Sequence, residues 1–346
     1  VFAVRTVVTP GLAAHGVCFG HVVTLVSPSL ADHNWRMVVA HELAHIWHIQ
    51  MSDGRVPRWF TEGLAEFETT QLKSYWKREM DAELWEALDG GKLKGIEKFN
   101  TMFTQAQSIG EIVLAYYYAT QVVRFIDGRW GTAIFPKLLR GWGERKSTTV
   151  VFQQVLGISL SDFDSALKEW LRTVWLKRFE GQFDPEHLPL GDPDGAVMEN
   201  LRSLFGSRKF AEAITVLDGL FARGKDSVRL RGLRASAAAA SEDWPTARDQ
   251  AKAGALLDPQ NLEVLGLLKQ AAEKLEDKDL VFETSKALAE IQEDNAELLL
   301  DVVRQASARG DVPAVLEYVE RALEVAPFAP EVQEALALAR TAGMSP

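Results

Sequence analysis

A 34-residue step in the second half of the chain constrains its fold more than any other feature. Positions that interrupt the apolar pattern, each before a segment with helical apolar periodicity, recur at this step in two interleaved series. The first series is Ser227, Asn261, Asn295 and Ala329, and the second is Ala211, Pro245, Asp279 and Pro313. Each unit then holds two helices whose apolar face only a neighbouring unit can cover. We therefore predict an all-α solenoid of stacked helix pairs for residues 196–346, with an irregular helical bundle as the alternative.

The period and the two helices per unit resemble tetratricopeptide repeats. The early tryptophan of that family is missing, and its proline before a new unit is kept only at Pro259 and Pro327. The resemblance implies a concave surface for a protein or peptide partner; the plainer alternative is an array that only shields or positions the rest of the chain. Residues 191–346 carry a net charge of −9, which favours a basic partner over an acidic one.

Composition changes near residue 190, which indicates a separate domain before the repeats. All seven histidines lie at or before His187, and nine of the ten tryptophans lie before Pro189. Residues 180–195 hold three prolines and three glycines, which a helix cannot continue through. We therefore predict a first domain over residues 1–180, a linker over 181–195 and the repeat domain over 196–346.

Charge, cysteine content and hydropathy exclude several classes of protein. The net charge of −10 argues against a nucleic-acid-binding protein. Cys18 is the single cysteine, so neither an intrachain disulfide nor a multi-cysteine zinc finger can form. The longest uncharged run, residues 6–31, contains prolines and glycines, so we expect no membrane span. No signal peptide is visible, and because the sequence starts at Val1 rather than Met, the compartment stays open, export included.

The first domain combines strands with helices and is predicted to be α+β with a small sheet. Runs of β-branched residues predict strands at Val1–Val8 and His21–Val26, with a turn region over Gly11–Gly20. A helical pattern without Pro or Gly begins at Trp35. Later helices are predicted at Phe60–Gln71, Tyr75–Leu88, Ile112–Ile126, Ala133–Leu139, Val150–Leu156 and Ser161–Arg178.

The segment His41-Glu42-Leu43-Ala44-His45 carries the strongest chemical signal. Two histidines at i and i+4 lie one turn apart on one helix face, so two imidazoles can reach one metal ion. Zinc lowers the pKa of a bound water to about 7, and Glu42 lies where its carboxylate can take that proton. The same pattern also occurs by chance in helices, where the histidines are simply hydrogen-bonded.

Glu62 and Glu66 extend this pattern into a candidate metal site. Sixteen residues separate His45 from Glu62, enough for one helix to end and a second to return. Glu62 can then be the third protein ligand of a tetrahedral zinc site with water in the fourth position. Glu66 lies one turn further along, where its carboxylate can accept a hydrogen bond from a ligand imidazole. Because the surrounding residues are apolar, burying so many ionisable groups would be costly without a cation.

Two stretches around these residues resemble a known family. V-V-A-H-E-L-A-H and V-P-R-W-F-T-E-G-L-A-E-F are similar to the gluzincin metallopeptidases of the peptidase MA-like group, over about residues 15–175. The resemblance implies a zincin-like domain that hydrolyses peptide bonds, with Zn2+ held by His41, His45 and Glu62 and with Glu42 as general base. It also implies that the strand near His21–Val26 is the sheet edge lining the cleft, and that a peptide or protein is the substrate.

The kind of peptidase activity is inferred from a missing element. Gluzincin aminopeptidases carry a G-x-M-E-N element upstream of the zinc helix, which grips the substrate amine. The similar stretch at Gly195–Asn200 has one extra residue and lies after the linker, so we predict an endopeptidase. A non-catalytic interaction or scaffold protein with a degenerate peptidase domain is the alternative, which the complete set of site residues argues against.

Three consecutive tyrosines, Tyr116, Tyr117 and Tyr118, could supply a donor for the negative charge that develops on the substrate carbonyl oxygen. Consecutive helical side chains point about 100° apart, so the three cannot all face the site. We assign Tyr116 as the donor because it shares a helix face with Thr120, and keep Tyr117 in reserve. The alternative is that all three are packing residues.

The other histidines are predicted to have no part in metal binding. His48 lies two turns after His41, about 10 Å along the helix, which is too far for the two to share one metal ion. We predict that His48 is a polar residue at the helix end. His15, His21 and His33 are predicted to be loop or surface residues, of which His21 could line the cleft.

Overall fold

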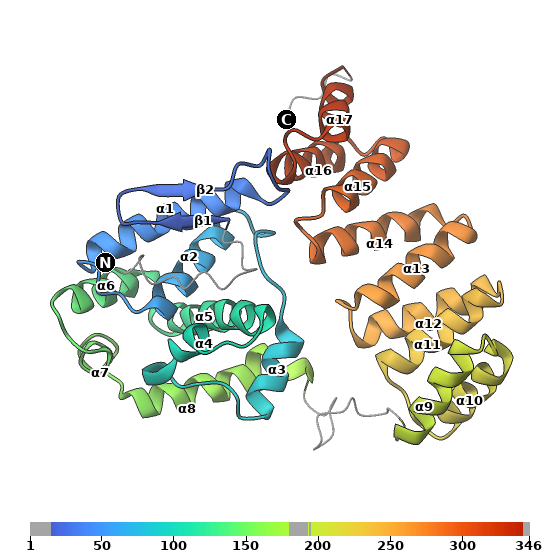
Figure 1. The fold of residues 1–346 in the computed structure, drawn as a ribbon, viewed down its shortest axis with the longest axis horizontal. Coiled ribbons are helices and arrows are strands. Elements are labelled where there is room, and N and C mark those ends of the chain that lie inside the picture. The colour runs from blue at the N-terminus through green and yellow to red at the C-terminus, as the bar shows by residue number, and fades with distance from the viewer. Residues whose placement is uncertain (1–14, 180–192, 194, 342–346) are drawn as a thin grey trace. The chain divides into compact units, whose positions relative to one another are not determined.

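The computed structural model describes residues 15–179, 193 and 195–341, and the chain forms two compact units, residues 1–180 and 181–346. The predicted strand at Val1–Val8 and most of the predicted linker lie outside the described residues. Helices dominate both units, and the described strands form one small sheet in the first unit (Figure 1). This composition agrees with the predicted α+β class. No helix in the described parts of the chain is long and apolar enough to cross a membrane.

The sheet of the first unit is a short antiparallel pair. Strand β1 (Gly16–Cys18) pairs with strand β2 (Val23–Leu25), with Val17 opposite Thr24. The strand predicted at His21–Val26 is present but shorter. Strand β1, in contrast, lies where the sequence predicted a turn, and the turn itself is confined to the residues between the strands.

A helical hairpin carries His41, Glu42 and His45 on its first helix and Glu62 on its second. Asn34 caps the N-terminus of helix α1 (Trp35–Met51), because its side chain accepts a hydrogen bond from the backbone N–H three residues on. After α1 the chain turns through Asp53 and Gly54, which both have positive φ angles, 49° and 70°. Helix α2 (Arg58–Leu72) then returns alongside α1. The predicted sequence of helix, loop and return helix is therefore confirmed.

Gly16 explains why β1 was mistaken for part of a turn. A Cβ atom at this position would come within 2.7 Å of the side chains of Val38 and Glu42 on α1. The glycine thus serves close approach of a strand to a helix, not a tight turn. The strand that packs against Glu42 is therefore β1.

Helix α5 (Ile109–Trp130) crosses α2 where no side chain fits between them. A Cβ on Gly63 would lie 2.4 Å from the carbonyl oxygen of Ala119, so the two backbones touch at this point. Trp59 and Phe60, one turn earlier on α2, are buried in the core with 1% and 0% of their surface exposed. The crossing fixes how the residues of α2 and α5 face each other.

The other α-helices in the described part of this unit all follow α2 in the sequence. They are α3 (Asp81–Asp89), α4 (Thr101–Thr104), α6 (Phe135–Gly143), α7 (Thr148–Val151) and α8 (Leu160–Trp170). The helix predicted at Tyr75–Leu88 begins only at Asp81. The segment before Asp81 takes a non-helical course that brings Arg78 to the Glu66 carboxylate.

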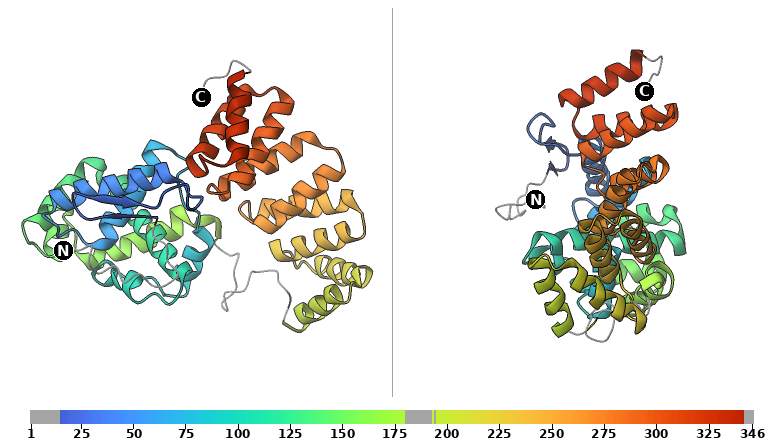
Figure 2. Two further views of the ribbon diagram at one scale, coloured as in Figure 1. Left: turned by 45° about the horizontal axis from the view of Figure 1, so that its top comes forward. Right: turned by 90° about the vertical axis from the view of Figure 1, so that its right-hand side faces the viewer.

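The second unit is a stack of helices arranged in successive pairs (Figures 1 and 2). Its helices are α9 (Gly195–Gly206), α10 (Phe210–Ala222), α11 (Val228–Ala240), α12 (Trp244–Leu257), α13 (Leu262–Lys274), α14 (Lys278–Ile291), α15 (Ala296–Arg309), α16 (Val312–Val325) and α17 (Pro330–Thr341). The side chains that cap their N-termini keep the 34-residue step, as Ser227, Asn261 and Asn295 in one series and Asp243, Asp277 and Asp311 in the other. The structure therefore agrees with the predicted helical repeat.

The turn inside each helix pair repeats as well. Arg208, Glu242, Glu276 and Gly310 follow one another at the same step and have φ angles of 55°, 59°, 57° and 70°. Only glycine adopts this left-handed conformation without steric cost. The 34-residue period is thus present in the backbone conformation even at positions where the residue is not glycine.

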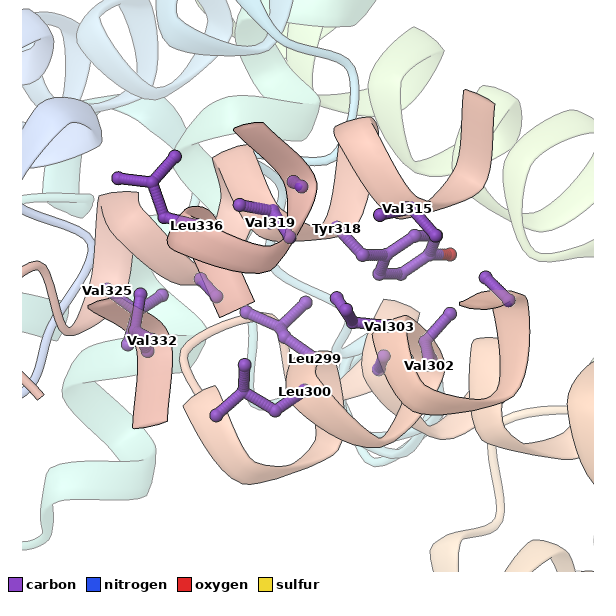
Figure 3. Close-up of a cluster of buried hydrophobic side chains, with 14 of the residues drawn as sticks. Leu299, Leu300, Val302, Val303, Val315, Tyr318, Val319, Val325, Val332 and Leu336 are labelled. Carbon is purple, nitrogen blue, oxygen red and sulfur yellow. The ribbon is translucent and has the colours of Figure 1, made fainter. Parts of the chain in front are cut away.

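Apolar side chains of α15, α16 and α17 form a buried cluster, which includes Leu299, Val303 and Val319 (Figure 3). Arg321 is buried beside this cluster, with 2% of its surface exposed. Its guanidinium forms an ion pair with Glu290 and lies over the ring of Tyr318 on the same helix. The buried charge of Arg321 is thus paired with a carboxylate from a neighbouring helix.

Candidate metal centre

The three predicted metal ligands converge between α1 and α2. The Nε2 atoms of His41 and His45 lie 3.1 Å apart, and Glu62 Oε2 lies 3.3 Å from the first and 3.2 Å from the second. One helical turn places both rings on the face of α1 that meets α2, and the loop between the helices returns Glu62 opposite them. The structure therefore brings together the three residues that the sequence singled out.

The separations between these three atoms fit a tetrahedral zinc site. Zinc bonds of about 2.0–2.1 Å at tetrahedral angles place neighbouring ligand atoms about 3.3 Å apart. The observed separations of 3.1, 3.2 and 3.3 Å match this spacing. Two imidazoles and one carboxylate are also a donor set that catalytic zinc sites use. The residues present could therefore hold a metal ion.

Glu62 is the charged member of this trio. Burial alone would raise the pKa of its carboxyl, but the neighbouring imidazoles of His45 and His41 outweigh burial and hold the pKa well below its usual value. Glu62 is therefore a carboxylate at neutral pH. It supplies the one negative charge among the three candidate ligands.

Glu42 lies next to the ligands, on the side of α1 that packs against β1, with 7% of its surface exposed. Burial raises the pKa of its carboxyl to about 7, with His45 opposing the shift and Glu62 adding to it. Because Gly16 leaves no free space beside it, the Glu42 side chain is held between the strand and the helix. A carboxyl with this pKa can take up and release a proton at neutral pH.

The second oxygen of Glu62 is held by Arg58, a residue that the sequence analysis did not consider. Arg58 donates from Nε to Glu62 Oε1 at 3.3 Å and from Nη2 to the Tyr116 hydroxyl at 3.4 Å. The i, i+4 spacing of Arg58 and Glu62 on α2 was the signal that could have revealed this pair. Burial and the charge of Glu62 raise the pKa of the Tyr116 phenol, so it keeps its proton and can donate a hydrogen bond.

The three consecutive tyrosines have three different environments. The Tyr117 hydroxyl donates to Asp81, and the Tyr118 hydroxyl donates to the backbone oxygen of Lys94 at 3.4 Å. Both phenols therefore have partners away from the candidate ligands. Tyr116 is the tyrosine whose hydroxyl the structure links, through its arginine partner, to the metal centre.

Glu66 lies behind His41, but its main partner is not the predicted one. Its Oε1 is 3.9 Å from His41 Nδ1, which is beyond hydrogen-bond distance. Arg78 Nε instead bonds both carboxylate oxygens, at 3.0 and 3.1 Å. The sequence missed this ion pair because it predicted a helix, not an irregular segment, around residue 78.

Two histidines that were predicted to be polar or surface residues are buried. His33 and His48 expose 1% and 2% of their surface. His33 packs against the His15 ring, at 4.4 Å between ring centroids. His48 faces α2 because it lies three residues after His45 on the same side of α1. Burial lowers the pKa of its imidazole, so His48 is neutral at pH 7.

Thr61 contacts both histidines at this end of the site. Its hydroxyl oxygen lies 2.8 Å from His45 Nδ1 and 3.0 Å from His48 Nδ1. The other ring nitrogen of His48, Nε2, lies 3.2 Å from Glu68 Oε2. A partner on the second nitrogen of a ligand imidazole fixes the orientation of its ring. The position of Thr61 directly before Glu62 was the available sequence signal for this contact.

The chemistry available at this centre follows from its own residues. Three convergent ligand atoms, an adjacent carboxyl with a pKa near 7 and a protonated phenol are the groups that metal-assisted hydrolysis of a carbonyl compound uses. Comparisons of the chain with protein-family models, with curated proteins and with solved structures gave no match.

Proposed function

We propose that the first unit is a zinc-dependent endopeptidase with a zincin-like fold, and that the helical repeats present a surface for a protein or peptide. The observation that carries the proposal is the convergence of the His41, His45 and Glu62 ligand atoms within 3.1–3.3 Å, with Glu42 directly beside them. A single helix histidine can meet a carboxylate from another helix at this distance through an ordinary hydrogen bond, as His48 and Glu68 do. The convergence of two imidazole nitrogens and one carboxylate oxygen on each other is what favours a metal site.

Glu42 is the general base in this proposal. A zinc ion bound by the three ligands would act as a Lewis acid and lower the pKa of a water molecule to about 7. The Glu42 carboxylate takes a proton from the attacking water and later passes it to the leaving amine. The pKa of about 7 and the enclosed position of the side chain both suit this double role.

Tyr116 and Arg58 stabilise the negative charge that develops on the former carbonyl oxygen. Donors already aimed at that charge cost no reorganisation during the reaction, which makes them effective. The hydrogen bonds of Arg58 to Glu62 and Tyr116 keep both donors in a fixed relation to the ligands. Because the Tyr116 phenol stays protonated, its hydroxyl is available as a donor at neutral pH.

Endopeptidase action rests on the missing element that would grip a substrate amine. The similar stretch at Gly195–Asn200 forms the start of α9 in the second unit, where it belongs to the helical array. The acidic second unit favours basic segments of a substrate or partner protein. A scaffold protein with an inactive peptidase domain remains the alternative function.

The test combines metal analysis with hydrolysis of a mixed peptide library. The purified protein should bind one zinc ion, and His45→Ala should abolish binding. Glu42→Gln should keep the zinc and lower hydrolysis by about 10²–10⁴-fold, because the amide cannot take the proton. Glu86→Gln on the exposed face of α3 is the matched control and should behave like the parent protein.

Three outcomes separate the alternatives. A protein that binds no zinc after reconstitution contradicts the metal site. A Glu42→Gln variant as active as the parent contradicts the role of Glu42. Full zinc occupancy without hydrolysis of any library peptide supports the scaffold function instead.

A further inference from the structure

The hydroxyl of Thr61 lies between two imidazoles and so joins a candidate ligand to a buried histidine that binds no metal. The contacts run from Glu68 to His48 at 3.2 Å, from His48 to Thr61 at 3.0 Å and from Thr61 to His45 at 2.8 Å. Glu68, at one end of this series of contacts, has 46% of its side chain exposed to solvent, whereas the His48 side chain is 2% exposed. All four residues lie on the facing sides of α1 and α2.

The direction of each hydrogen bond follows from counting protons, starting at Glu68. A carboxylate only accepts hydrogen bonds, so Nε2 of His48 must carry a proton and donate it. The Nδ1 of a neutral His48 ring is then an acceptor, and the Thr61 hydroxyl must donate its single proton to it. The Thr61 oxygen is left as an acceptor, so His45 donates from Nδ1.

With these hydrogen-bond directions, Nε2 of His45 carries no proton and its lone pair is available. Nε2 is also the atom that points to His41 and Glu62. We propose that Glu68, His48 and Thr61 form a directed hydrogen-bond chain that holds His45 in the tautomer needed for metal binding. The proposal rests on the metal site proposed above. His48 and Thr61 are positioning residues in this scheme, because they act on the metal only through His45.

The other ligand imidazole provides an internal contrast. Nδ1 of His41 lies 3.9 Å from its nearest carboxylate oxygen, on Glu66, and so lacks a comparably short contact there. The chain therefore makes His45 the more firmly oriented of the two histidines. Loss of the chain should weaken metal binding without removing any ligand.

The first test measures zinc affinity by competition with a chromophoric chelator. Thr61→Val keeps the shape of the side chain and removes the hydroxyl, and it should weaken zinc binding about 10–100-fold, as loss of such outer partners typically does. Thr61→Ser restores the hydroxyl and should bind zinc within about threefold of the parent. Thr69→Val is the matched control: Thr69 is buried on the same helix, but its hydroxyl bonds only a backbone oxygen.

The second test reads the tautomer of His48 directly. Long-range 1H–15N spectra of protein labelled in its seven histidines distinguish rings protonated at Nε2 from rings protonated at Nδ1. The chain requires the Nε2–H form for His48, assigned by comparison with His48→Gln. This readout needs no activity, no bound zinc and no Thr61 variant, so it remains decisive if Thr61→Val fails to fold.

The results separate this inference from the metal site itself. If the parent binds zinc and Thr61→Val binds it equally well, the chain is overturned and the metal site stands. If His48 is protonated at Nδ1, the proposed direction is overturned whatever the zinc affinity. If the parent binds no zinc, the metal site fails, and the chain fails with it as a support for metal binding.

Discussion

The two units of this protein assign roles to their residues in different ways. In the first unit the neighbours Tyr116, Tyr117 and Tyr118 bond an arginine of the candidate metal centre, a carboxylate and a backbone oxygen, respectively. In the second unit Asp243 and Asp277 lie 34 residues apart and do the same thing, because each caps the N-terminus of a helix. In the first unit, residues adjacent in the sequence have different structural roles. In the second unit, residues far apart in the sequence have the same role.

The difference reflects where the packing partners come from. A repeat unit packs against the units before and after it in the sequence. The position of a residue within the 34-residue period therefore determines whether it caps a helix, lies in a turn or is buried. In the first unit, residues such as Arg58 and Tyr116 meet although 58 positions separate them. A role there depends on the tertiary fold, so identical side chains in a row need not be equivalent.

The largest effect expected from this comparison concerns the tyrosines. Tyr116→Phe should lower kcat by about 10²–10³-fold with zinc content unchanged, as for loss of one donor to the developing oxyanion. Tyr117→Phe and Tyr118→Phe should leave kcat within a few-fold of the parent, because their hydroxyls bond elsewhere. Peptide hydrolysis under saturating substrate, with zinc measured on the same samples, provides the comparison. Equal losses in all three variants would show that the row acts through packing alone.

A residue of intermediate effect is Asp301, which breaks the rule for the second unit. Its carboxylate accepts hydrogen bonds from Lys269 at 2.6 Å and Ser285 at 2.8 Å, while Leu267 and Ala335 occupy the positions one period away. Burial alone would raise the pKa of Asp301, but these hydrogen bonds outweigh it and lower the pKa below its usual value. Asp301→Asn should therefore cost about 1–2 kcal/mol of stability at pH 7.

The pH dependence has a definite sign. Because the pKa of Asp301 is lower in the folded protein than in the unfolded chain, its contribution is complete above about pH 4–5 and is lost as the pH falls through the folded value. The stability gap between parent and Asp301→Asn should thus stay constant from pH 6 to 8 and narrow below pH 4. Urea unfolding followed by pulsed hydrogen exchange on peptides of α13–α15 measures it. Asp249→Asn, at an exposed aspartate, is the control, and a gap that widens in acid would contradict the assignment.

The smallest effect tests the repeated turn. Glu276→Gly should stabilise the second unit by about 0.5 kcal/mol, because relief of the left-handed strain slightly exceeds the added flexibility of the unfolded chain. Glu242→Gly should do the same, whereas Gly310→Ala should destabilise by about 1 kcal/mol. The same exchange measurement on α11–α16 reports all three. Opposite signs for Glu242 and Glu276 would mean that the turns are not equivalent.

The predictability of the fold follows the same division. In the second unit the period located the helix pairs, because each local signal recurs and its partner lies one step away. Of the predicted breaks, Ser227, Asn261 and Asn295 are N-caps, whereas the second predicted series lies two residues after the aspartates that cap the other helices. In the first unit the hairpin of α1 and α2 was predictable from helix spacing. Strand β1 was not, because Gly16 reports close packing on Val38 and Glu42, and a glycine in a sequence reads equally as a turn.

The candidate site was predictable where one helix face sets the geometry. Spacing alone placed His41 and His45 together, and the length of the intervening chain allowed Glu62 to join them. The contacts of Arg78 were not predicted because they depend on the course of a loop. Those of Thr61 were not predicted because they depend on how two helices face each other. The burial of His48 was not predicted, because only its distance from His41 was considered and not its proximity to helix α2.

The contact between Gly63 and the Ala119 carbonyl oxygen has a consequence for how this site could change. Gly63 follows the candidate ligand Glu62, and Ala119 lies three residues after the proposed donor Tyr116, so the helices cross beside both residues. Any substitution at residue 63 would wedge the helices apart and shift ligand and donor together. In the proposed peptidase, substrate preference could therefore vary through loops and strand edges, whereas substitution of Gly63 could not gradually adjust the distance between Glu62 and Tyr116.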